Sequence, residues 1–421
     1  MRRLFLAIAI ISAIAIGSIA MPAARAGGFL LAEEGAPATG MVGAFAAKAD
    51  DPSAIFYNPA GIARMRGLHI YAGGMLLVGQ PAASNSSAIV VPGFGPSGEL
   101  HANTFVQFVP NVYVNYGFPH DIAIGVGLFT NVGLKVTWPI DWPGRFLSTW
   151  ATVQTLTVNP SVAWSPVSWF SIGAGFDITP GRAELKRYEN LVDAEALLRF
   201  RGNDTALGGN VGVLFRTPKW HGVPPLSLGV TYRSRQTFHF DDGGLQINAP
   251  LEFSTLLHDV KAKASLPTPD IVTIGVGVQP VDRLFLQVQF DWNGWSRFES
   301  LTLKVPDNPA LDQTIPQNWR DGYVLRFGTE WADEQWAVRG GIGFDWTPVP
   351  ASTLSPIIPD GNRLLLSAGG SVKLPHDLAA DLGVMAIVLL SRRSELPVFP
   401  VDYQGWAVLV NLGFSYRTPQ Q

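Results

Sequence analysis

Long runs of alternating apolar and polar residues constrain the fold of this chain more than any other feature. From Leu284 to Asn293, one face carries Leu, Leu, Val, Phe and Trp, and the other is mostly Gln, Asp and Asn. The same alternation is present over 106–118, 335–346 and 363–374. A period of two residues is typical of β-strands. Strands of soluble sheets average about 5 to 6 residues, whereas a strand that crosses a membrane needs about 9 to 11.

Composition favours the membrane over a large soluble sandwich or propeller. Charged residues make up 15% of the 421 residues, against about 25% in soluble domains. Many apolar faces end in an aromatic residue, as an interfacial girdle would; the candidates are Trp331, Trp336, Trp346, Trp406, Phe414 and Tyr416. Net charge is -3, which gives no sign of nucleic-acid binding, and the absence of Cys excludes disulfides and Cys-based metal sites.

Connections between the runs alternate between short and long. Short turns fall at 119–121, 165–167, 280–282, 332–334 and 375–377, with a longer one at 217–224. Long connections cover 80–102, 137–149, 181–204, 241–256, 302–319, 347–361 and 392–402. This arrangement predicts an all-β fold, a transmembrane antiparallel β-barrel of about 14 strands with short periplasmic turns. The expected strands begin near Leu68, Thr104, Asp121, Ala151, Ser168, Thr205, Pro225, His258, Leu284, Asp321, Glu334, Gly361, Leu378 and Tyr403.

Residues 1–26 have the pattern of a secretory signal peptide. Arg2 and Arg3 precede an apolar run from 4 to 19, and Ala24, Arg25 and Ala26 form a small-x-small cleavage site. An uncleaved membrane anchor is the alternative. Past this leader, no stretch reaches the roughly 18 to 20 apolar residues that a membrane helix needs.

The segment 43–64 resembles neither the leader nor the strands. Small residues dominate its first half, and Asn58, Pro59, Ala60 and Gly61 form a turn in which Asn bonds backbone and Pro fixes φ. A small, turn-rich segment without its own core must pack inside something larger. We therefore expect residues 27–66 to be a hatch, or plug, within the barrel formed by 67–421. Phe56 and Tyr57 are expected to contact the inner wall.

Short motifs are spread along the chain, beginning with A-x-x-A-D at 46–50 followed by FYNPA at 56–60. The later ones are FVPN at 108–111, G-x-G at 125–127 with TNVGL at 130–134, LP at 266–267 with DWNGWS at 291–296, and FDWTPVP at 344–350 with IPDGNR at 358–363. These motifs resemble those of the FadL/TodX family, whose members are outer-membrane transporters for long-chain fatty acids and other hydrophobic compounds. Thr347 replaces a family Ser, and Tyr416 is followed by a polar tail.

The resemblance implies a monomer in the outer membrane of a Gram-negative bacterium that passively transports hydrophobic small molecules without a cofactor. Its implied partners are that substrate, outer-membrane lipid and lipopolysaccharide, and the barrel-assembly machinery. A non-specific porin or a structural or adhesive barrel is the alternative. An enzyme is disfavoured because the seven His are scattered and no Gly-x-Ser-x-Gly sequence is present. No metal site is expected.

The long connection 181–203 is the candidate for first contact with ligand. Residues 184–200 have helical spacing, with Leu185, Tyr188 and Val192 on one side. An exposed apolar helix face would form a docking groove, or the helix merely caps the barrel. The resemblance assigns Arg187 to a fatty-acid carboxylate; a solvated loop charge is the alternative. No second basic residue is found at 313–316, so an uncharged hydrocarbon remains open.

The resemblance also implies a kink in the third strand that opens the wall sideways and releases ligand into the membrane. Gly127, Asn131 and Gly133 interrupt that strand, and Gly weakens ladder pairing. Structural packing of the glycines is the competing interpretation.

Overall fold

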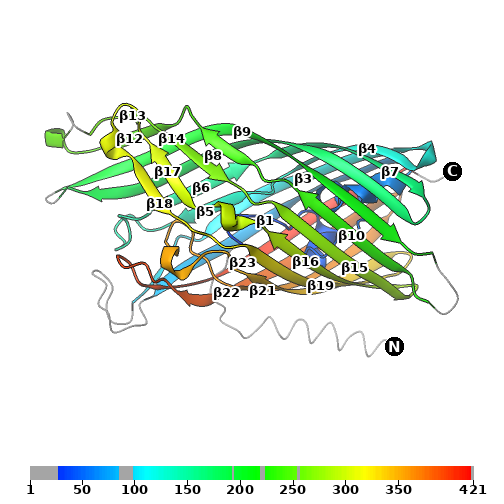
Figure 1. Cartoon of the computed structure of the whole chain (residues 1–421). Coiled ribbons are helices and arrows are strands. Elements are labelled where there is room, and N and C mark those ends of the chain that lie inside the picture. The colour runs from blue at the N-terminus through cyan, green and yellow to red at the C-terminus, as the bar shows by residue number, and fades with distance from the viewer. Residues whose placement is uncertain (1–26, 85–97, 192–193, 219–222, 254–256, 419–421) are drawn as a thin grey trace.

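The fold is a closed antiparallel β-barrel (Figure 1). The computed structural model describes residues 27–84, 98–191, 194–218, 223–253 and 257–418. Within these residues fourteen strands pair each with the next, and the last pairs with the first. They are β1 (Gly67–Ser84), β3 (Phe105–Phe118), β4 (Ile122–Phe129), β7 (Thr157–Val167), β8 (Phe170–Asn190), β9 (Glu195–Arg216), β10 (Leu226–Arg233), β15 (Ile271–Val281), β16 (Leu284–Asn293), β19 (Gly322–Ala332), β20 (Trp336–Trp346), β21 (Arg363–Leu374), β22 (Leu378–Arg393) and β23 (Asp402–Arg417).

The predicted number of strands is confirmed, and most predicted starts lie within a few residues of the observed ones. Three differ more: β7 begins at Thr157 rather than near Ala151, β9 at Glu195 rather than near Thr205, and β15 at Ile271 rather than near His258. The predicted signal peptide, 1–26, lies outside the described residues. Among the described residues, no helix has the length and apolar character needed to cross a membrane.

The outer face of the barrel is apolar because alternate residues of each strand point away from the lumen. Val288 and Phe290 of β16 are 48% and 40% exposed, while Gln287 and Gln289, which alternate with them, are buried inside. Four aromatic residues lie in register across neighbouring strands from β10 to β20; they are Tyr232, Trp292, Tyr323 and Trp346. An apolar outer band bordered by aromatic residues is the surface that lipid requires.

The two ends of the barrel differ. At the short-turn end, neighbouring strands are joined by tight turns, two of which have consecutive residues with positive φ, His120 with Asp121 and His376 with Asp377. Such turns match the twist of paired strands. At the long-loop end a second sheet stands over the mouth (Figure 1). It consists of β11 (Thr237–Phe240), β14 (Lys263–Pro267), β17 (Ser300–Lys304) and β18 (Gln313–Pro316), and the smaller strands nearby are β2 (Glu99–His101), β12 (Gly244–Asn248) and β13 (Val260–Lys261).

The helix expected over 184–200 is wrong. β8 and β9 continue as a paired hairpin above the barrel, in register from Phe170 with Phe215 to Asn190 with Glu195. Leu185, Arg187, Leu198 and Phe200 face inward, and Glu184, Arg199 and Arg201 face outward. The apolar positions coincide with helical spacing, but the hairpin extends the ladder of the barrel wall, and β6 (Trp150–Thr155) and β12 pair with its outer edges.

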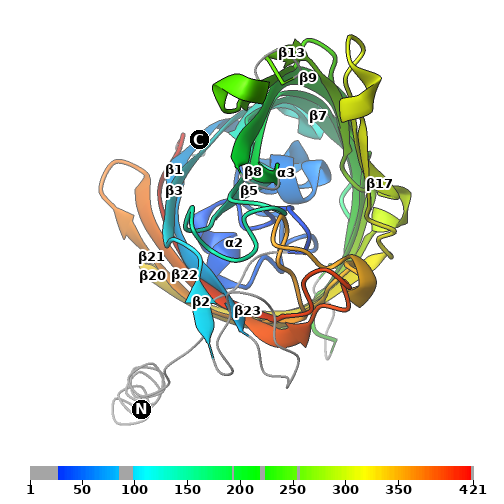
Figure 2. The same ribbon diagram turned by 90° about the vertical axis from the view of Figure 1, so that its left-hand side faces the viewer.

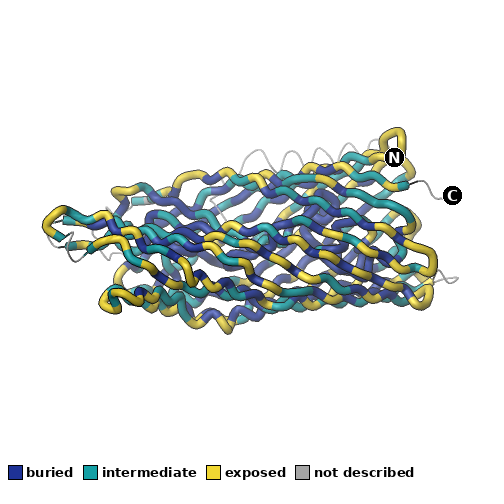
Figure 3. The backbone as a smooth tube through the Cα atoms, turned by 90° about the horizontal axis from the view of Figure 1, so that it is seen from above, coloured by how far each residue is buried: buried dark blue, intermediate teal, exposed yellow. Residues whose placement is uncertain are grey.

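Residues 27–66, which we name the lumenal segment, lie inside the barrel (Figure 2). The segment contains three short helices, α2 (Ala36–Gly40), α3 (Ala54–Tyr57) and the 3-10 helix η1 (Pro59–Arg64). Nearly all of its side chains are buried, and Figure 3 shows the buried backbone running through the barrel. The other 3-10 helices are η2 (Pro119–Asp121), η3 (Leu251–Phe253), η4 (Trp295–Arg297), η5 (Pro309–Leu311) and η6 (Ala351–Thr353).

The wall changes its pairing at the third strand. β3 pairs with β4 only from Val112 onward, and β4 ends at Phe129. The chain resumes as β5 (Gly133–Thr137), which pairs with β6 (Trp150–Thr155) instead of β3. Among the described residues, 105–111 of β3 therefore have ladder partners on β1 alone. We name this stretch the wall break; it ends where the Asn103 amide donates to the Thr137 carbonyl at 2.7 Å.

Candidate functional site

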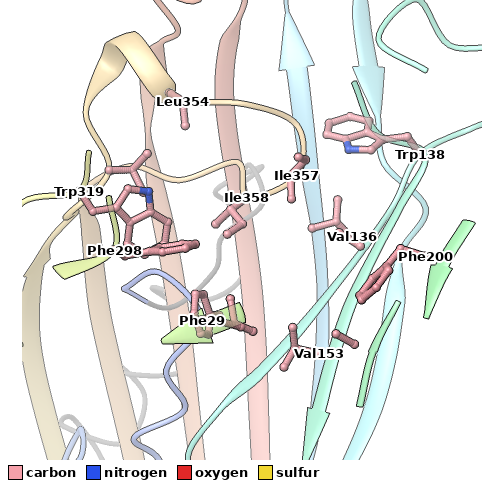
Figure 4. Close-up of a cluster of buried hydrophobic side chains, with 14 of the residues drawn as sticks. Phe29, Val136, Trp138, Val153, Phe200, Phe298, Trp319, Leu354, Ile357 and Ile358 are labelled. Carbon is pink, nitrogen blue, oxygen red and sulfur yellow. The ribbon is translucent and has the colours of Figure 1, made fainter. Parts of the chain in front are cut away.

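The half of the lumen nearest the long-loop end is lined by apolar and aromatic side chains (Figure 4). Phe29, near the start of the lumenal segment, packs edge-on against Trp295, with ring centroids 4.7 Å apart. Phe298 and Trp319 also surround the Phe29 ring, with ring centroids 6.2 and 6.0 Å from its own. Across the lumen lie Val136, Val153 and Phe200, with Leu354, Ile357 and Ile358 above (Figure 4). Phe29 therefore forms the apolar floor of this half.

A cavity of about 330 Å³ opens at the long-loop end, and we name it the mouth cavity. It lies between the β8–β9 hairpin and the second sheet. Leucines dominate its lining, and they are Leu147, Leu185, Leu191, Leu198, Leu245, Leu257, Leu301, Leu303 and Leu311. Lys186, Arg187 and Glu189 supply its charged groups. An apolar hollow with a few polar groups is typical of sites for small hydrophobic ligands.

Two smaller cavities, about 40 Å³ each, continue inward from the mouth cavity. The inner cavity shares Leu185, Phe200 and Ile357 with the mouth cavity and has no charged residue in its lining. The wall cavity shares Phe29 and Leu134 with the inner cavity. Because each cavity shares lining residues with the next, the three form a sequence.

The wall cavity lies beside the wall break. Its lining includes Gly133 and Leu134 of β5, which bound the break, and Leu77 of β1 and Leu409 of β23 from the facing wall. The sequence of apolar cavities thus runs from the long-loop end to the place where the third strand loses its pairing.

The other half of the lumen is polar, and there the lumenal segment is tied to the wall by hydrogen bonds. Asn58 donates to the carbonyls of Ala46 at 2.9 Å and Val213 of β9 at 3.1 Å. Gln289 of β16 accepts from the amides of Phe45 and Ala46 at 3.0 and 3.1 Å. Further ties come from Asn210 on β9, Arg233 on β10, Ser367 on β21 and Asn411 on β23.

Buried ion pairs reinforce these ties. Arg326 of β19 is 4% exposed; it donates to Asp291 at 3.0 Å and to the Val42 carbonyl at 2.6 Å. Glu33 of the lumenal segment lies 3.5 Å from the same guanidinium. Lys48 lies 3.0 Å from Glu330, which also pairs with Arg339 at 2.6 Å. A buried charge is tolerated only when it is paired and hydrogen-bonded, so these contacts hold the segment in one position.

Glu34 joins the lumenal segment to the third strand just before the wall break. The amide of Thr130 donates to one carboxyl oxygen at 3.2 Å, and the hydroxyl of Tyr113 on β3 lies 3.4 Å from the other. Burial raises the pKa of Glu34 to about 8, because the interior stabilises the neutral form. At neutral pH this carboxyl is therefore mostly protonated.

The residues assigned to ligand capture fall in different places. Leu185 and Arg187 both line the mouth cavity. Arg187 donates to the Phe146 carbonyl at 3.2 Å and pairs with Glu189 at 2.6 Å. Tyr188 is outside the cavity lining and points to the other face of β8, and Val192 lies outside the described residues.

The residues of the Asn-Pro turn pack against the wall at two glycines. Asn58 caps η1, its side-chain oxygen accepting from the Ala60 amide at 3.2 Å. A Cβ at Gly173 would lie 2.5 Å from Pro59, and one at Gly212 would overlap Asn58. Only Gly permits this close approach.

Phe56 and Tyr57 point in different directions. The Phe56 ring packs edge-on against Phe129 of β4 at 5.0 Å and lies under Arg233 of β10, so it contacts the wall as expected. The Tyr57 hydroxyl instead donates to the Ala32 carbonyl and accepts from the Glu34 amide, at 3.0 and 2.9 Å. Both hydrogen bonds of the Tyr57 hydroxyl therefore lie within the lumenal segment, where they give the Ala32 carbonyl and the Glu34 amide a partner.

The three residues assigned to the wall break are brought together with the lumenal segment. Asn131 uses its carbonyl to accept from the Leu31 amide at 3.0 Å, and the Gly133 amide donates to the Phe29 carbonyl at 2.9 Å. A Cβ at Gly133 would lie 2.8 Å from Leu31, and one at Gly127 would lie 2.9 Å from Ile55. Both glycines thus allow the close approach of the lumenal segment, and the third strand is interrupted between Phe129 and Gly133, beside the wall break.

Much of the cavity lining was not assigned from the sequence. Leu245, and then Leu301 and Leu303, alternate with polar residues inside segments that were interpreted as loops. That alternation is the signal that would have found them. Phe29 carries no such signal, because its partners lie more than two hundred residues away along the chain. Among the described residues no cluster of His, Asp or Glu is suited to holding a metal ion.

A closed barrel with an apolar outer face, its lumen occupied by its own N-terminal segment, defines a transmembrane β-barrel protein of the outer-membrane class. The sequence profile of the outer membrane protein transport family OMPP1/FadL/TodX matches residues 17–417. The chain belongs to that family. It is therefore an outer-membrane transporter rather than an enzyme, with its short turns in the periplasm and its long loops outside the cell.

Relatives and solved structures agree with this placement. A long-chain fatty acid transport protein of Salmonella typhi is 25% identical over 337 residues, covering 73% of this chain and 76% of that protein. The corresponding protein of Escherichia coli K12 is 24% identical over 368 residues, covering 77% and 81%. A Pseudomonas aeruginosa FadL homologue superposes with a TM-score of 0.78 at 21% identity, covering 93% and 99%. The Ralstonia pickettii toluene transporter TbuX gives 0.68 at 18%, covering 92% and 99%.

Proposed function

We propose that this protein carries long-chain fatty acids or hydrocarbons from the mouth cavity to the wall break and releases them sideways into the membrane. The observation that supports this proposal is the sequence of three apolar cavities that share lining residues and end beside unpaired wall. A hydrophobic solute that leaves through the wall enters lipid directly, so it never crosses the polar half of the lumen.

In this proposal the mouth cavity captures the ligand, and Arg187 at its edge offers a charge-assisted hydrogen bond to a carboxylate. The inner cavity then takes the apolar chain, since its lining holds no charge. Both kinds of substrate suit the path, and relatives include proteins named for fatty acids and for toluene. A carboxylate would stay at the mouth until the chain has moved inward.

The lumenal segment acts as a hatch in this proposal. It occupies the periplasmic half and is tied to several strands, so it blocks water and polar solutes. A non-specific porin needs an open polar lumen, and that alternative is disfavoured for this reason. The bonds from Phe29, Leu31 and Glu34 to 130–133 couple the hatch to the wall break, so a ligand that displaces Phe29 would also loosen the break.

The route is tested by narrowing the wall cavity. Leu77→Trp places an indole in that cavity, and the matched control Leu76→Trp adds the same group on the lipid-facing side of β1, where Leu76 is 42% exposed. Uptake of oleate and of toluene is measured in a strain that lacks its own transporter. We expect the wild type and Leu76→Trp to restore uptake and Leu77→Trp to fail while folding normally.

Two outcomes would contradict the proposal in distinguishable ways. Equal uptake with and without the wild-type protein would reject transport of these compounds. Full uptake by Leu77→Trp would reject release through the wall while leaving transport itself in place.

A further inference from the structure

A group of basic side chains lies on the outer surface of the barrel, away from the ligand path. Along β8 and β9, Glu184 and Arg201 face each other in register, as do Lys186 and Arg199. Glu184, Arg199 and Arg201 alternate with Leu185 and Phe200, which line the inner cavity, so their own side chains point outward. Lys186 lies on the same outward row but also borders the mouth cavity. Arg182 is the preceding outward-facing residue of β8, two positions before Glu184. On the other side, Gly244 of β12 pairs with both Arg201 of β9 and Lys261 of β13. We name these five cations the outer basic patch.

One carboxylate gathers three of these cations. The two Glu184 side-chain oxygens lie 2.7 Å from Arg199, 3.1 Å from Arg201 and 3.3 Å from Lys186. Arg182 is exposed and has no ion pair among the described residues, and Lys261 is exposed as well. Glu195, the next carboxylate along the outer face of β9, is already paired with Arg145. Asp259, two residues before Lys261, adds a second carboxylate and accepts from the Ile247 amide at 2.8 Å. The five cations still outnumber the carboxylates of the patch, and like charges at this spacing repel unless anions lie nearby.

The position of the patch relative to lipid suggests what those anions are. Below it on the same two strands, the outward side chains are apolar, with Phe176, Ile178 and Leu207 at 48%, 38% and 59% exposed. Arg182 follows Ile178 by four residues, which is about 13 Å along a strand. The cations thus begin just above the apolar band at the extracellular end. In an outer membrane this level holds the phosphorylated sugars of the outer-leaflet glycolipid.

We propose that the outer basic patch is a binding site for the phosphate groups of lipid A, the membrane anchor of lipopolysaccharide. Arg199 and Arg201 present planar guanidinium groups that bind phosphate through paired hydrogen bonds, and Arg182 and Lys261 add charge at the edges. The acyl chains would lie against Ile178 and Leu207, so that one molecule contacts both surfaces. Trp150 of β6 lies in register with Lys186, at the side of the patch farthest from the apolar band, and its ring is 4.4 Å from the Lys186 ammonium.

The test compares one triple variant with a matched control. In the variant, Arg182, Arg199 and Arg201 are changed to Gln. In the control, Arg66, Arg283 and Lys373, three exposed cations at the short-turn end, are changed to Gln. Full-length proteins are purified in detergent, their folding is checked by the shift in gel mobility on heating, and binding of bisphosphorylated lipid A is titrated by native mass spectrometry.

We expect the patch variant to bind lipid A at least about tenfold more weakly than wild type, and the control to bind unchanged. Dephosphorylated lipid A should bind the wild type as weakly as lipid A binds the patch variant. Unchanged affinity in the patch variant would overturn the proposal, and so would equal binding of the dephosphorylated lipid. Full displacement of lipid A by millimolar inorganic phosphate would show a site for free phosphate and reject the lipid as its occupant.

Discussion

The two halves of the lumen are built from opposite chemistry. In the periplasmic half, buried charges and amide side chains bind the lumenal segment, and Arg326 alone contacts Val42, Asp291 and Glu33. In the extracellular half, Phe29 of the same segment meets only aromatic and aliphatic side chains. Hydrogen bonds and ion pairs are directional, and a buried polar group that loses its partner costs free energy, so they fix the lumenal segment in one position. Apolar packing contacts can instead be replaced by contacts with a ligand. The comparison suggests that one half holds the segment and the other half passes ligand.

Removing Arg326, the central cation of the polar half, should lower the free energy of unfolding more than any other proposed substitution. Arg326→Ala leaves Asp291 and Glu33 buried beside an empty position, and breaking a buried pair costs about 3 to 5 kcal/mol. The free energy of unfolding is measured by urea titration in lipid vesicles. Arg283→Ala is the control, because its ion pair with Asp333 is exposed and should be worth about 1 kcal/mol or less. Equal destabilisation by the two changes would remove the basis of the comparison.

A charge placed in the apolar half of the lumen should weaken ligand binding without releasing the lumenal segment from the wall. Ile358 lines the inner cavity, where no charged residue is found. Ile358→Asp should weaken binding of oleate and of toluene by about 10- to 100-fold, because an unpaired charge there opposes an apolar ligand. Ile358→Leu is the control and should bind normally. Protection of 27–66 from protease should be the same in all three proteins; loss of protection in Ile358→Asp alone would show that the halves are not separable.

The sequence predicted the lipid-embedded part of the fold well and the part above it poorly. Within the membrane one side of each strand must be apolar, so β16 and β20 show clean alternation. Above the membrane that constraint ends: on β8 the outward positions become Glu184 and Lys186, and the inward ones change from Ala183 and Leu185 to Arg187. The remaining apolar residues then matched helical spacing. Leu185 and Arg187 were still assigned to the ligand site, because they line the cavity in either conformation.

Contacts inside the lumen could not be predicted from periodicity. The turn at Asn58 could be, since Asn and Pro determine it locally. The pairing of Phe29 with Trp295 and Trp319 depends on how strands far apart in sequence curve around the same space. The contacts of Tyr57 could not be predicted for the same reason. Its hydroxyl bonds the Glu34 amide and the Ala32 carbonyl, which come close to it only through the folded path of the segment.

A pH change should loosen the contact between the two halves. Burial raises the pKa of Glu34 to about 8, well above its ordinary value near 4.5. The folded contact therefore keeps its proton while an exposed carboxyl loses it, so its stability is full below pH 4.5 and falls as pH rises through 8. Amide exchange at Thr130, corrected for intrinsic rates, should rise by about tenfold or more between pH 6 and 9. Glu34→Gln should flatten this profile; an unchanged profile in that variant would assign the effect to another group.

The smallest effect is expected at the mouth cavity, from Arg187→Ala. Its guanidinium is already engaged by Glu189 and the Phe146 carbonyl, so a carboxylate would replace existing bonds and gain little from them. We expect oleate to bind about threefold more weakly, which corresponds to less than about 1 kcal/mol, and toluene to bind unchanged. Equilibrium binding of both ligands to the purified protein gives these values.

Two further variants sharpen the assignment of Arg187. Arg187→Lys keeps the charge and should recover most oleate affinity, whereas Arg182→Ala removes a nearby charge that faces outward and should change neither ligand. Weaker toluene binding in Arg187→Ala would mean that the side chain supports the cavity wall rather than contacting a carboxylate. The mouth would then resemble the inner cavity in selecting ligands by shape and apolar area.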